Sequence, residues 1–222
     1  MKTHFDITKL ILHKKKFLSK KECDLLINFY ENNKKEKTRE HCAHAETGID
    51  TESTFDVIDI PYGTKENKLV SSSIEKIINM WQDYTDKFKM FHKYKRNSML
   101  YSHKLRLMKY ETGAKIHPHT DHDPYIYGSC TFNLNEEYEG GEFTFFRGKK
   151  KIKLNKGDAL IWPADYFWVH EVKPITKGVR YSTNCFLLSV PNSIRENIFN
   201  FTDLLLKNYK FNSKDGIKYN IK

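Results

Sequence analysis

Apolar residues recur at intervals of three and four in two stretches near the start of the chain. Residues 19–33 open with Ser19-Lys-Lys-Glu22, which has the spacing of a helix capping box, and they continue with the helical period. Residues 72–90 place three isoleucines and a tryptophan on one helical face. Both patterns predict amphipathic helices.

Between these helices the pattern changes twice. Residues 40–54 are polar and show no period, so they predict a loop. Residues 55–61 alternate apolar and polar side chains, which is typical of a strand. We therefore expect residues 1–98 to form a mainly helical support with one edge strand.

From residue 99 onward, short runs of period two are separated by Gly, Asn and Asp turns. These runs cover residues 104–110, 127–134, 141–146, 151–154, 159–162, 168–172 and 179–187. They predict an α+β fold with a double-stranded β-helix (jelly-roll) core at residues 99–190. Residues 193–209 predict a C-terminal helix within the segment 191–222, and residues 1–222 are expected to form a single domain.

The composition fits a globular protein. Of the 222 residues 39% are apolar and 30% are charged, which excludes a disordered, collagen-like or polytopic membrane chain. The sequence has no run of about 18 apolar residues, and its first residues lack the apolar run of a signal peptide. The four cysteines are widely spaced and are expected to be reduced thiols. These features predict a cytoplasmic protein with no membrane span.

The net charge of +10 favours acidic partners and lowers the threshold for contact with nucleic acid. The lysines, however, are spread along the chain in short clusters without interleaved aromatic residues. This distribution disfavours dedicated nucleic-acid binding. The sequence does not indicate an oligomeric state.

The densest group of potential metal ligands is His117-Pro-His-Thr-Asp-His-Asp123. Residues two apart in a strand point to the same face, so His119 and Asp121 are expected to present donor atoms to one point. His170, within a largely apolar run, is the best third ligand, although a lone histidine there would usually be a core residue. Two imidazoles and one carboxylate form the facial triad of non-haem Fe(II) oxygenases, which leaves positions open for cosubstrate and dioxygen.

Arg180 follows His170 by ten residues, in the next predicted strand. An arginine inside a β-barrel is a costly buried charge unless a carboxylate meets it. A dicarboxylate cosubstrate that binds iron through its keto acid would present its distal carboxylate to this guanidinium. Ser182 faces the same way and is expected to donate a second hydrogen bond. The alternative is an Arg180 that is exposed or paired with an aspartate.

Residues 105–188 resemble the 2-oxoglutarate/Fe(II) dioxygenases, and among these the prolyl 4-hydroxylase-like catalytic domain. The resemblance covers a little over a third of the chain. The matching motifs occur in the order Tyr110-Glu-Thr-Gly113, His117-Pro-His-Thr-Asp121, Asn133-Leu-Asn-Glu-Glu-Tyr-Glu-Gly-Gly-Glu142, Lys156-Gly-Asp-Ala-Leu-Ile-Trp162 and Trp168-Val-His-Glu-Val-Lys-Pro-Ile-Thr-Lys-Gly-Val-Arg-Tyr-Ser182.

The resemblance implies that His119, Asp121 and His170 bind Fe(II) and that Arg180 binds the C5 carboxylate of 2-oxoglutarate. It also implies that Tyr110 contributes a hydroxyl to that carboxylate, with a core tyrosine as the alternative. Dioxygen would be the second cosubstrate and ascorbate a candidate accessory cofactor. The chain would then hydroxylate an unactivated C–H bond and release succinate and carbon dioxide.

A prolyl residue in a peptide or protein is the substrate that the resemblance implies. The aromatic residues near the metal motifs are candidates for a peptide groove, and residues 40–54 are a candidate lid. These aromatic residues are Tyr125, Tyr127, Trp162, Tyr166, Phe167 and Trp168. Departures from the family pattern at Ile116-His117, Phe143 and Arg180 bear on the substrate but leave the iron ligands intact.

Three other functions are alternatives. The oxygenase would act on a free amino acid or on another protein side chain, or it would demethylate nucleic acid. The third alternative is a cupin-like metal or ligand-binding protein without oxygenase activity, in which His117 and His119 ligate a metal together with His170. His122 is a further histidine beside the metal motif, and we expect it and His117 to lie outside the ligand set.

Overall fold

The computed structural model describes residues 5–89, 98–102, 105–123, 125–189, 217–219 and 221. Its helices are α1 (Lys20–Asn33) and α2 (Lys65–Asp86), with 3-10 turns at Ile7–Leu10 and Lys34–Glu36. The larger sheet consists of β1 (Leu12–Lys14), β4 (Asp56–Asp59), β5 (Tyr101–Ser102), β6 (Arg106–Tyr110), β8 (Ile126–Asn133), β12 (Ala159–Pro163), β15 (Arg180–Leu188) and β16 (Ile217–Lys218). The smaller sheet consists of β7 (Ile116–His119), β10 (Phe143–Phe145), β11 (Lys150–Ile152) and β13 (His170–Val172). Two separate strand pairs are β2 (His41–Ala43) with β3 (Asp50–Glu52), and β9 (Tyr138–Gly140) with β14 (Ile175–Gly178).

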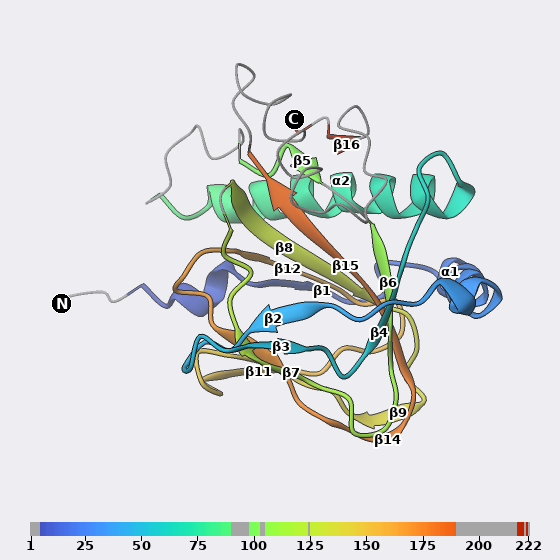
Figure 1. The fold of residues 1–222 in the computed structure, drawn as a ribbon. Coiled ribbons are helices and arrows are strands. Elements are labelled where there is room, and N and C mark those ends of the chain that lie inside the picture. The colour runs from blue at the N-terminus through green and yellow to red at the C-terminus, as the bar shows by residue number, and fades with distance from the viewer. Residues whose placement is uncertain are drawn as a thin grey trace.

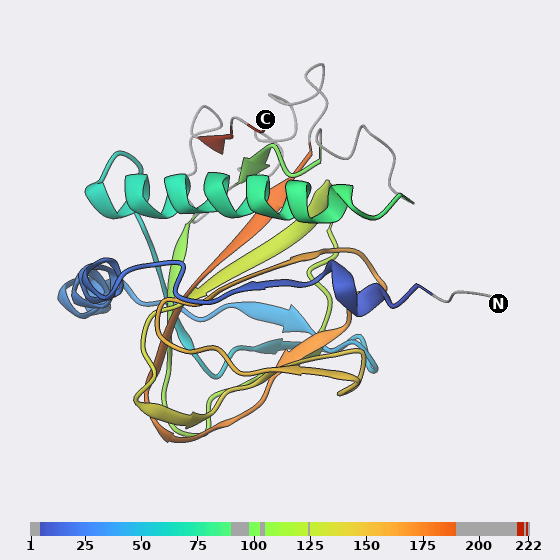
Figure 2. The same ribbon diagram turned by 180° about the vertical axis from the view of Figure 1, so that it is seen from behind.

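Two sheets of antiparallel strands face each other, and α2 lies across the outside of the larger one (Figures 1 and 2). The larger sheet has the order β1-β12-β8-β15-β5-β16, and β6 pairs with both β15 and β4. The smaller sheet has the order β11-β10-β13-β7. The predicted α+β fold class with a jelly-roll core is therefore confirmed.

The first helix begins as the capping motif predicts. The Ser19 hydroxyl accepts a hydrogen bond from the Glu22 amide, and the Glu22 carboxylate accepts one from the Ser19 amide. The second helix starts earlier than the predicted residue 72, because Thr64 caps it by accepting from the Asn67 amide. Its first turn is mostly polar, so the apolar period does not reveal it. The helix ends at Asp86, four residues before the predicted end at residue 90.

Alternate residues of the larger sheet point to α2 and to the smaller sheet. On the outer side, Leu107, Phe132 and Ile161 pack with the isoleucines of α2 in the main apolar core. The inner side of β8 and β15 instead carries buried polar side chains, namely Ser129, Thr131, Asn133, Arg180 and Ser182. Burial of polar groups is unfavourable unless they find partners, so this inner face is a candidate ligand site.

Residues 40–54 contain a hairpin of β2 and β3, not the predicted loop. Most side chains of both strands are exposed, so no apolar alternation marks them in the sequence. The hairpin contacts the smaller sheet, where the Ala45 amide donates to the Pro118 carbonyl at 2.7 Å. In Figure 1 it runs in front of the space between the sheets.

The other predicted strands appear with bounds shifted by a few residues, and β1, β5, β7, β9, β14 and β16 are additional. The predicted helix at residues 193–209 lies outside the described residues. Within the described ranges, no helix is both long enough and apolar enough to cross a bilayer. The single-domain organisation and the cytoplasmic location stay predictions.

Candidate metal centre

The smaller sheet and the turn that follows β7 bring His119, Asp121 and His170 together. In the pairing of β7 with β13, His119 lies directly opposite His170. Nε2 of His119 is 3.3 Å from Oδ1 of Asp121, and Nε2 of His170 is 3.4 Å from Oδ2 of the same carboxylate. Donor atoms of all three side chains lie within 4.8 Å of one another. Since β7 ends at His119, the turn places Asp121, and the strand alternation assumed from the sequence does not.

Hydrogen bonds to the backbone fix the orientation of both imidazoles. Nδ1 of His119 lies 2.9 Å from the His117 carbonyl, and Nδ1 of His170 lies 2.9 Å from the Trp168 carbonyl. A carbonyl only accepts, so Nδ1 carries a proton in each ring, and Nε2 holds the lone pair whenever the ring is neutral. Both lone pairs are therefore available to a metal beside Asp121.

Burial and charge set the protonation of the three side chains. Burial lowers the pKa of His170 to about 4, although the Asp121 charge opposes this. Burial also favours a neutral Asp121, but the adjacent His170 and His119 outweigh it and hold the pKa of Asp121 below its usual value. For His119 burial is likewise outweighed, and the hydrogen bond to Asp121 raises its pKa. An anionic Asp121 beside a neutral His170 matches the donor set of a divalent metal.

Aromatic side chains hold the ring of His170. Phe145 stacks on it with ring centroids 5.5 Å apart, and Trp162 approaches edge-on at 5.1 Å. His170 is only 3% exposed. The donor set is thus rigid and largely shielded from water, which suits a metal that must keep open positions.

Arg180 is a buried cation without a carboxylate. It is 1% exposed, and its Nε donates to Oδ1 of Asn133 at 2.9 Å. Its guanidinium carbon lies 4.9 Å from the ring centroid of Tyr110 and 5.3 Å from that of Phe143. The two terminal nitrogens, NH1 and NH2, have no hydrogen-bond partner in the part of the chain that the structure describes. A buried guanidinium with two unused nitrogens fits the distal carboxylate of a keto diacid.

The two other residues predicted to bind this carboxylate are adjacent to Arg180. Tyr110 lies opposite Arg180 in the pairing of β6 with β15, and Ser182 lies opposite Asn133 in the pairing of β15 with β8. Both are about 1% exposed. Burial raises the pKa of Tyr110, so its phenol stays a neutral donor. The phenol oxygen lies 3.8 Å from the sulfur of Met108 and also interacts with the Ser182 hydroxyl.

Sequence reasoning missed three polar residues of this interior. Ser129 Oγ and Trp162 Nε1 are buried without partners among the described residues, and the two residues pair across β8 and β12. Asn133 is fully buried beside Arg180. Their signal in the sequence is the alternation of Ser129, Thr131 and Asn133 with apolar residues, which marks a polar inner face.

His117 does not join the donor group. Its ring stacks on His44 of the hairpin with centroids 5.2 Å apart, and its Nδ1 lies 3.4 Å from the Thr51 hydroxyl. The metal-ligand grouping among the described residues omits it. The cupin-like alternative, which needs His117 as a ligand, therefore loses its third imidazole.

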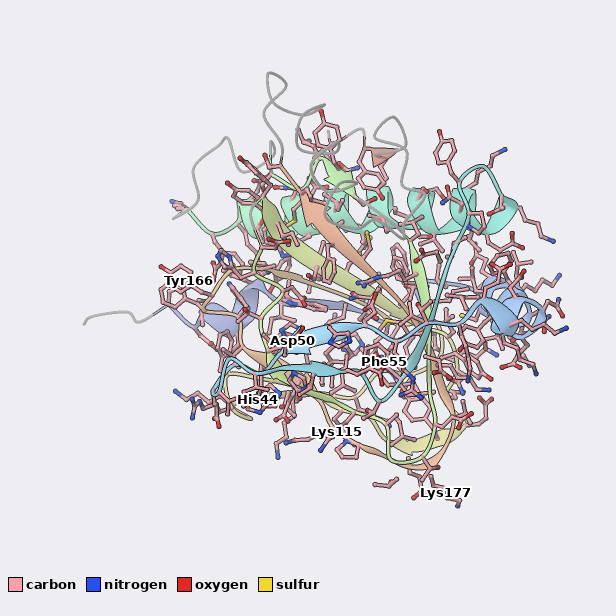
Figure 3. The ribbon with its side chains drawn as sticks, viewed as in Figure 1. His44, Asp50, Phe55, Lys115, Tyr166 and Lys177 are labelled. Atoms are coloured by element: carbon pink, nitrogen blue, oxygen red, sulfur yellow. The ribbon has the colours of Figure 1, made fainter. Side chains whose placement is uncertain are left out.

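Of the aromatic residues near the metal motifs, Tyr125 is partly buried against Tyr101 and Leu188. The other five divide into two groups. Trp162 and Trp168 are buried in the apolar core between the sheets, so they line no surface groove. Tyr127, Tyr166 and Phe167 are at least half exposed. Tyr166 packs on Phe167 with ring centroids 4.2 Å apart and lies 6.0 Å from the ring of His122, the residue after Asp121. Tyr166 projects from the molecule at the left of Figure 3.

A cavity of about 410 Å³ lies outside this interior, under the turn of the hairpin. Thr144 and Glu171 line it, together with Glu46 of the turn. Thr144 and Glu171 alternate with Phe145 and His170, so their side chains belong to the outer face of the smaller sheet. His170 also lines this cavity. His44 and Asp50 of the hairpin lie on the same side of the molecule as Tyr166 in Figure 3.

Comparison with known proteins agrees with the geometry. The sequence model of the 2OG-Fe(II) oxygenase superfamily matches residues 105–188, which contain all three metal-ligand candidates and Arg180. The matched region is less than half of the chain. A PKHD-type hydroxylase of Janthinobacterium sp. (strain Marseille) is 44% identical over 59 residues, which are 25% of each chain. The first curated relatives that the chain matches are all PKHD-type hydroxylases. The chain covers 25–43% of their length.

Solved structures share the fold of this chain. The viral collagen prolyl hydroxylase of Paramecium bursaria Chlorella virus-1 aligns with a TM-score of 0.56 and 20% identity, over 82% of this chain and 97% of that one. A prolyl-4-hydroxylase of Pseudomonas putida aligns with a TM-score of 0.59 and 16% identity, over 82% and 93% of the two chains. The resemblance to a prolyl 4-hydroxylase-like fold is therefore confirmed.

Proposed function

We propose that the chain is a 2-oxoglutarate- and Fe(II)-dependent dioxygenase. His119, Asp121 and His170 would hold Fe(II), and Arg180 would hold the C5 carboxylate of 2-oxoglutarate with help from Tyr110 and Ser182. The observation that carries this proposal is the buried guanidinium of Arg180, whose terminal nitrogens have no partner among the described residues. A structural arginine would be paired there, whereas a cosubstrate site needs it free.

When bound, iron, 2-oxoglutarate and dioxygen supply the oxidising power to insert oxygen into an unactivated C–H bond, with succinate and carbon dioxide as products. The chain contributes position and shielding. The two backbone-held imidazoles and Asp121 would hold the metal, and Arg180 would hold the far end of the cosubstrate. The rings of Phe145 and Trp162 keep water from His170.

Anaerobic spectroscopy tests this proposal directly. Addition of 2-oxoglutarate to the Fe(II)-loaded protein should produce a weak visible charge-transfer band. Succinate is the ligand control. It is a diacid without a keto group, so it should give no band. A cupin-like protein would show no band with either compound, and that result would refute the oxygenase assignment.

For the substrate we propose a prolyl residue in a peptide or protein. The exposed pair of Tyr166 and Phe167 beside His122 supports this, because aromatic side chains bind extended, proline-containing segments. The similar PKHD-type hydroxylases and prolyl hydroxylases point the same way. A free amino acid or another protein side chain is the alternative, and no described feature favours it over a peptide.

Mass spectrometry of proline-containing peptides, each paired with its alanine analogue, tests the substrate. We expect a gain of one oxygen on proline only. Replacement of Tyr166 and Phe167 by serine should reduce peptide turnover about tenfold and leave the band with 2-oxoglutarate unchanged. Tyr62→Ser removes another exposed aromatic residue, 70% accessible, and is the matched control. Equal turnover of the alanine peptides would refute a prolyl substrate.

We also propose that the hairpin β2–β3 covers the substrate, as the lid predicted for residues 40–54. Its base is anchored, since Glu40 pairs with the buried Arg106. Its turn is held by the hydrogen bond from the Ala45 amide to Pro118 and by the exposed ion pair of Glu46 with Arg147. A segment that closes over a site needs an anchored base and a turn that is held by few contacts.

A further inference from the structure

Asn133 contacts Arg180 through an amide whose hydrogen-bonding groups are all in use. Its Oδ1 accepts from Nε of Arg180 at 2.9 Å and from the Tyr138 hydroxyl at 3.2 Å. Its Nδ2 donates to the carbonyls of Asn135 and Leu154, at 2.6 and 3.3 Å. Since carbonyls accept only, the amide cannot be turned around without losing both bonds. Asn133 therefore presents a fixed acceptor to Arg180.

The rest of the Arg180 side chain is confined as well. The rings of Tyr110 and Phe143 lie on its guanidinium, and the chain at Gly141 passes close to its stem. A Cβ at residue 141 would lie 3.4 Å from Cδ of Arg180 and 2.7 Å from Cδ1 of Ile175. The arginine thus has little room to move along its own axis.

A guanidinium binds a carboxylate in one of two bidentate ways. In the side-on mode Nε and one terminal nitrogen donate, and in the end-on mode both terminal nitrogens donate. Here Nε is occupied by Asn133, while NH1 and NH2 have no partner among the described residues. Only the end-on mode is left open.

We propose that Asn133 is a specificity-determining positioning residue, which forces end-on binding and thereby sets the chain length of the keto diacid. This rests on the proposed function. End-on binding places the distal carboxylate at one depth relative to His119, Asp121 and His170. A keto acid one carbon shorter or longer than 2-oxoglutarate then fails to reach both ends of the site together. Without Asn133, Nε of Arg180 is also free to donate, and side-on binding would place the distal carboxylate at a second depth in the site.

Calorimetric binding of three keto diacids to the anaerobic, Mn(II)-loaded protein tests this inference without turnover. The probes are oxaloacetate, 2-oxoglutarate and 2-oxoadipate. The wild-type protein should prefer 2-oxoglutarate by at least about tenfold, the size of one hydrogen bond to a charged group. Asn133→Leu should weaken 2-oxoglutarate binding by about tenfold and reduce the preference over 2-oxoadipate to less than about threefold, with Mn(II) affinity unchanged.

Two further variants separate positioning from folding. Asn133→Asp keeps the shape of the side chain but gives Arg180 a permanent carboxylate partner, so all three acids should bind more weakly. Asn135→Leu is the matched control, because the Asn135 amide bonds the backbone of Val179 and Tyr181, on the strand of Arg180, and not the Arg180 side chain. It should lower thermal stability and leave the preference among the acids intact.

The inference is overturned if Asn133→Leu retains the wild-type preference, or if Asn135→Leu loses it to the same extent. Binding of 2-oxoglutarate by wild type together with either result leaves the proposed function standing. Absence of binding for all three acids overturns the proposed function, and this inference with it.

Discussion

Two buried arginines on the inner face of the larger sheet should respond in opposite ways to replacement by methionine. Arg180 has no carboxylate partner among the described residues, and its NH1 and NH2 make no hydrogen bond. Arg106, 6% exposed, forms an ion pair with Glu40. Methionine matches the length of the arginine stem without its charge, so each replacement isolates the effect of one guanidinium.

The contacts of Arg180 allow a magnitude to be assigned. Methionine loses the bond to Asn133 and the approach to two rings, but Asn133 Oδ1 keeps the Tyr138 hydroxyl as a donor. In exchange, an unpaired buried charge disappears, and such replacements commonly stabilise a protein by 1–4 kcal/mol. We expect Arg180→Met to raise the free energy of unfolding by about 1 kcal/mol, which raises Tm by about 2–4 °C in a protein of this size.

The control variant, Arg106→Met, should lower the free energy of unfolding, because it leaves a carboxylate without its ion-pair partner. In Arg106→Met the partly buried Glu40 loses its ion-pair partner, which should cost about 3 kcal/mol. Thermal unfolding of both variants, with and without saturating 2-oxoglutarate, measures the contrast. Arg180→Met should also lose the rise in Tm that the ligand gives wild type, because a lost buried ion pair costs binding about 2–5 kcal/mol. If Arg180→Met is destabilised as much as Arg106→Met, Arg180 is a structural residue and the site argument fails.

Three other predictions concern the metal, the acid limb of stability and one turn. Asp121→Ala should bring the Fe(II) content of purified protein near zero, measured by elemental analysis, and retention of one equivalent would exclude Asp121 as a ligand. The Tyr181 hydrogen bond lowers the pKa of Glu31 to about 2, so its stabilising effect is present above the unfolded value near 4.5 and is lost as pH falls toward 2. Tm measured from pH 6 to 2 should therefore fall less steeply in Glu31→Gln than in wild type. Gly157→Ala should lower stability by at least about 2 kcal/mol in denaturant titrations, because φ is +79° and the new Cβ would lie 2.3 Å from the Leu18 carbonyl oxygen; an unchanged midpoint would contradict that strain.

The sequence predicted those structural features that depend on a residue and its near neighbours in the chain. The start of α1 was predicted because Ser19 and Glu22 cap it within four residues. The grouping of His119 with His170 and the burial of Arg180 were predictable because polar residues of these types are rare in apolar strands. The strands β8, β12 and β15 were predictable from alternation, since each has one face on the α2 core.

Features that depend on pairing between distant segments were not predictable. The hairpin β2–β3 has no apolar face, so its residues look like a loop. The position of Asp121 depends on where β7 ends, and that end is set by pairing with β13. The contact of Asn133 with Arg180 arises from the register of β8 with β15, in which Asn133 lies opposite Ser182. No spacing within the sequence encodes that register.

The charges of the interior couple the proposed metal site at Asp121 to the proposed cosubstrate site at Arg180. When both histidines are neutral, as metal ligands must be, Asp121 and Arg180 carry opposite single charges, and Glu40 neutralises Arg106. A divalent metal at Asp121 brings two positive charges, and a keto diacid at Arg180 brings two negative charges. Either ligand alone leaves this largely buried space with a net charge of about two, which is costly, whereas both together leave it neutral. Each ligand would therefore strengthen the binding of the other by the same factor, because their charges are opposite and share one largely buried space.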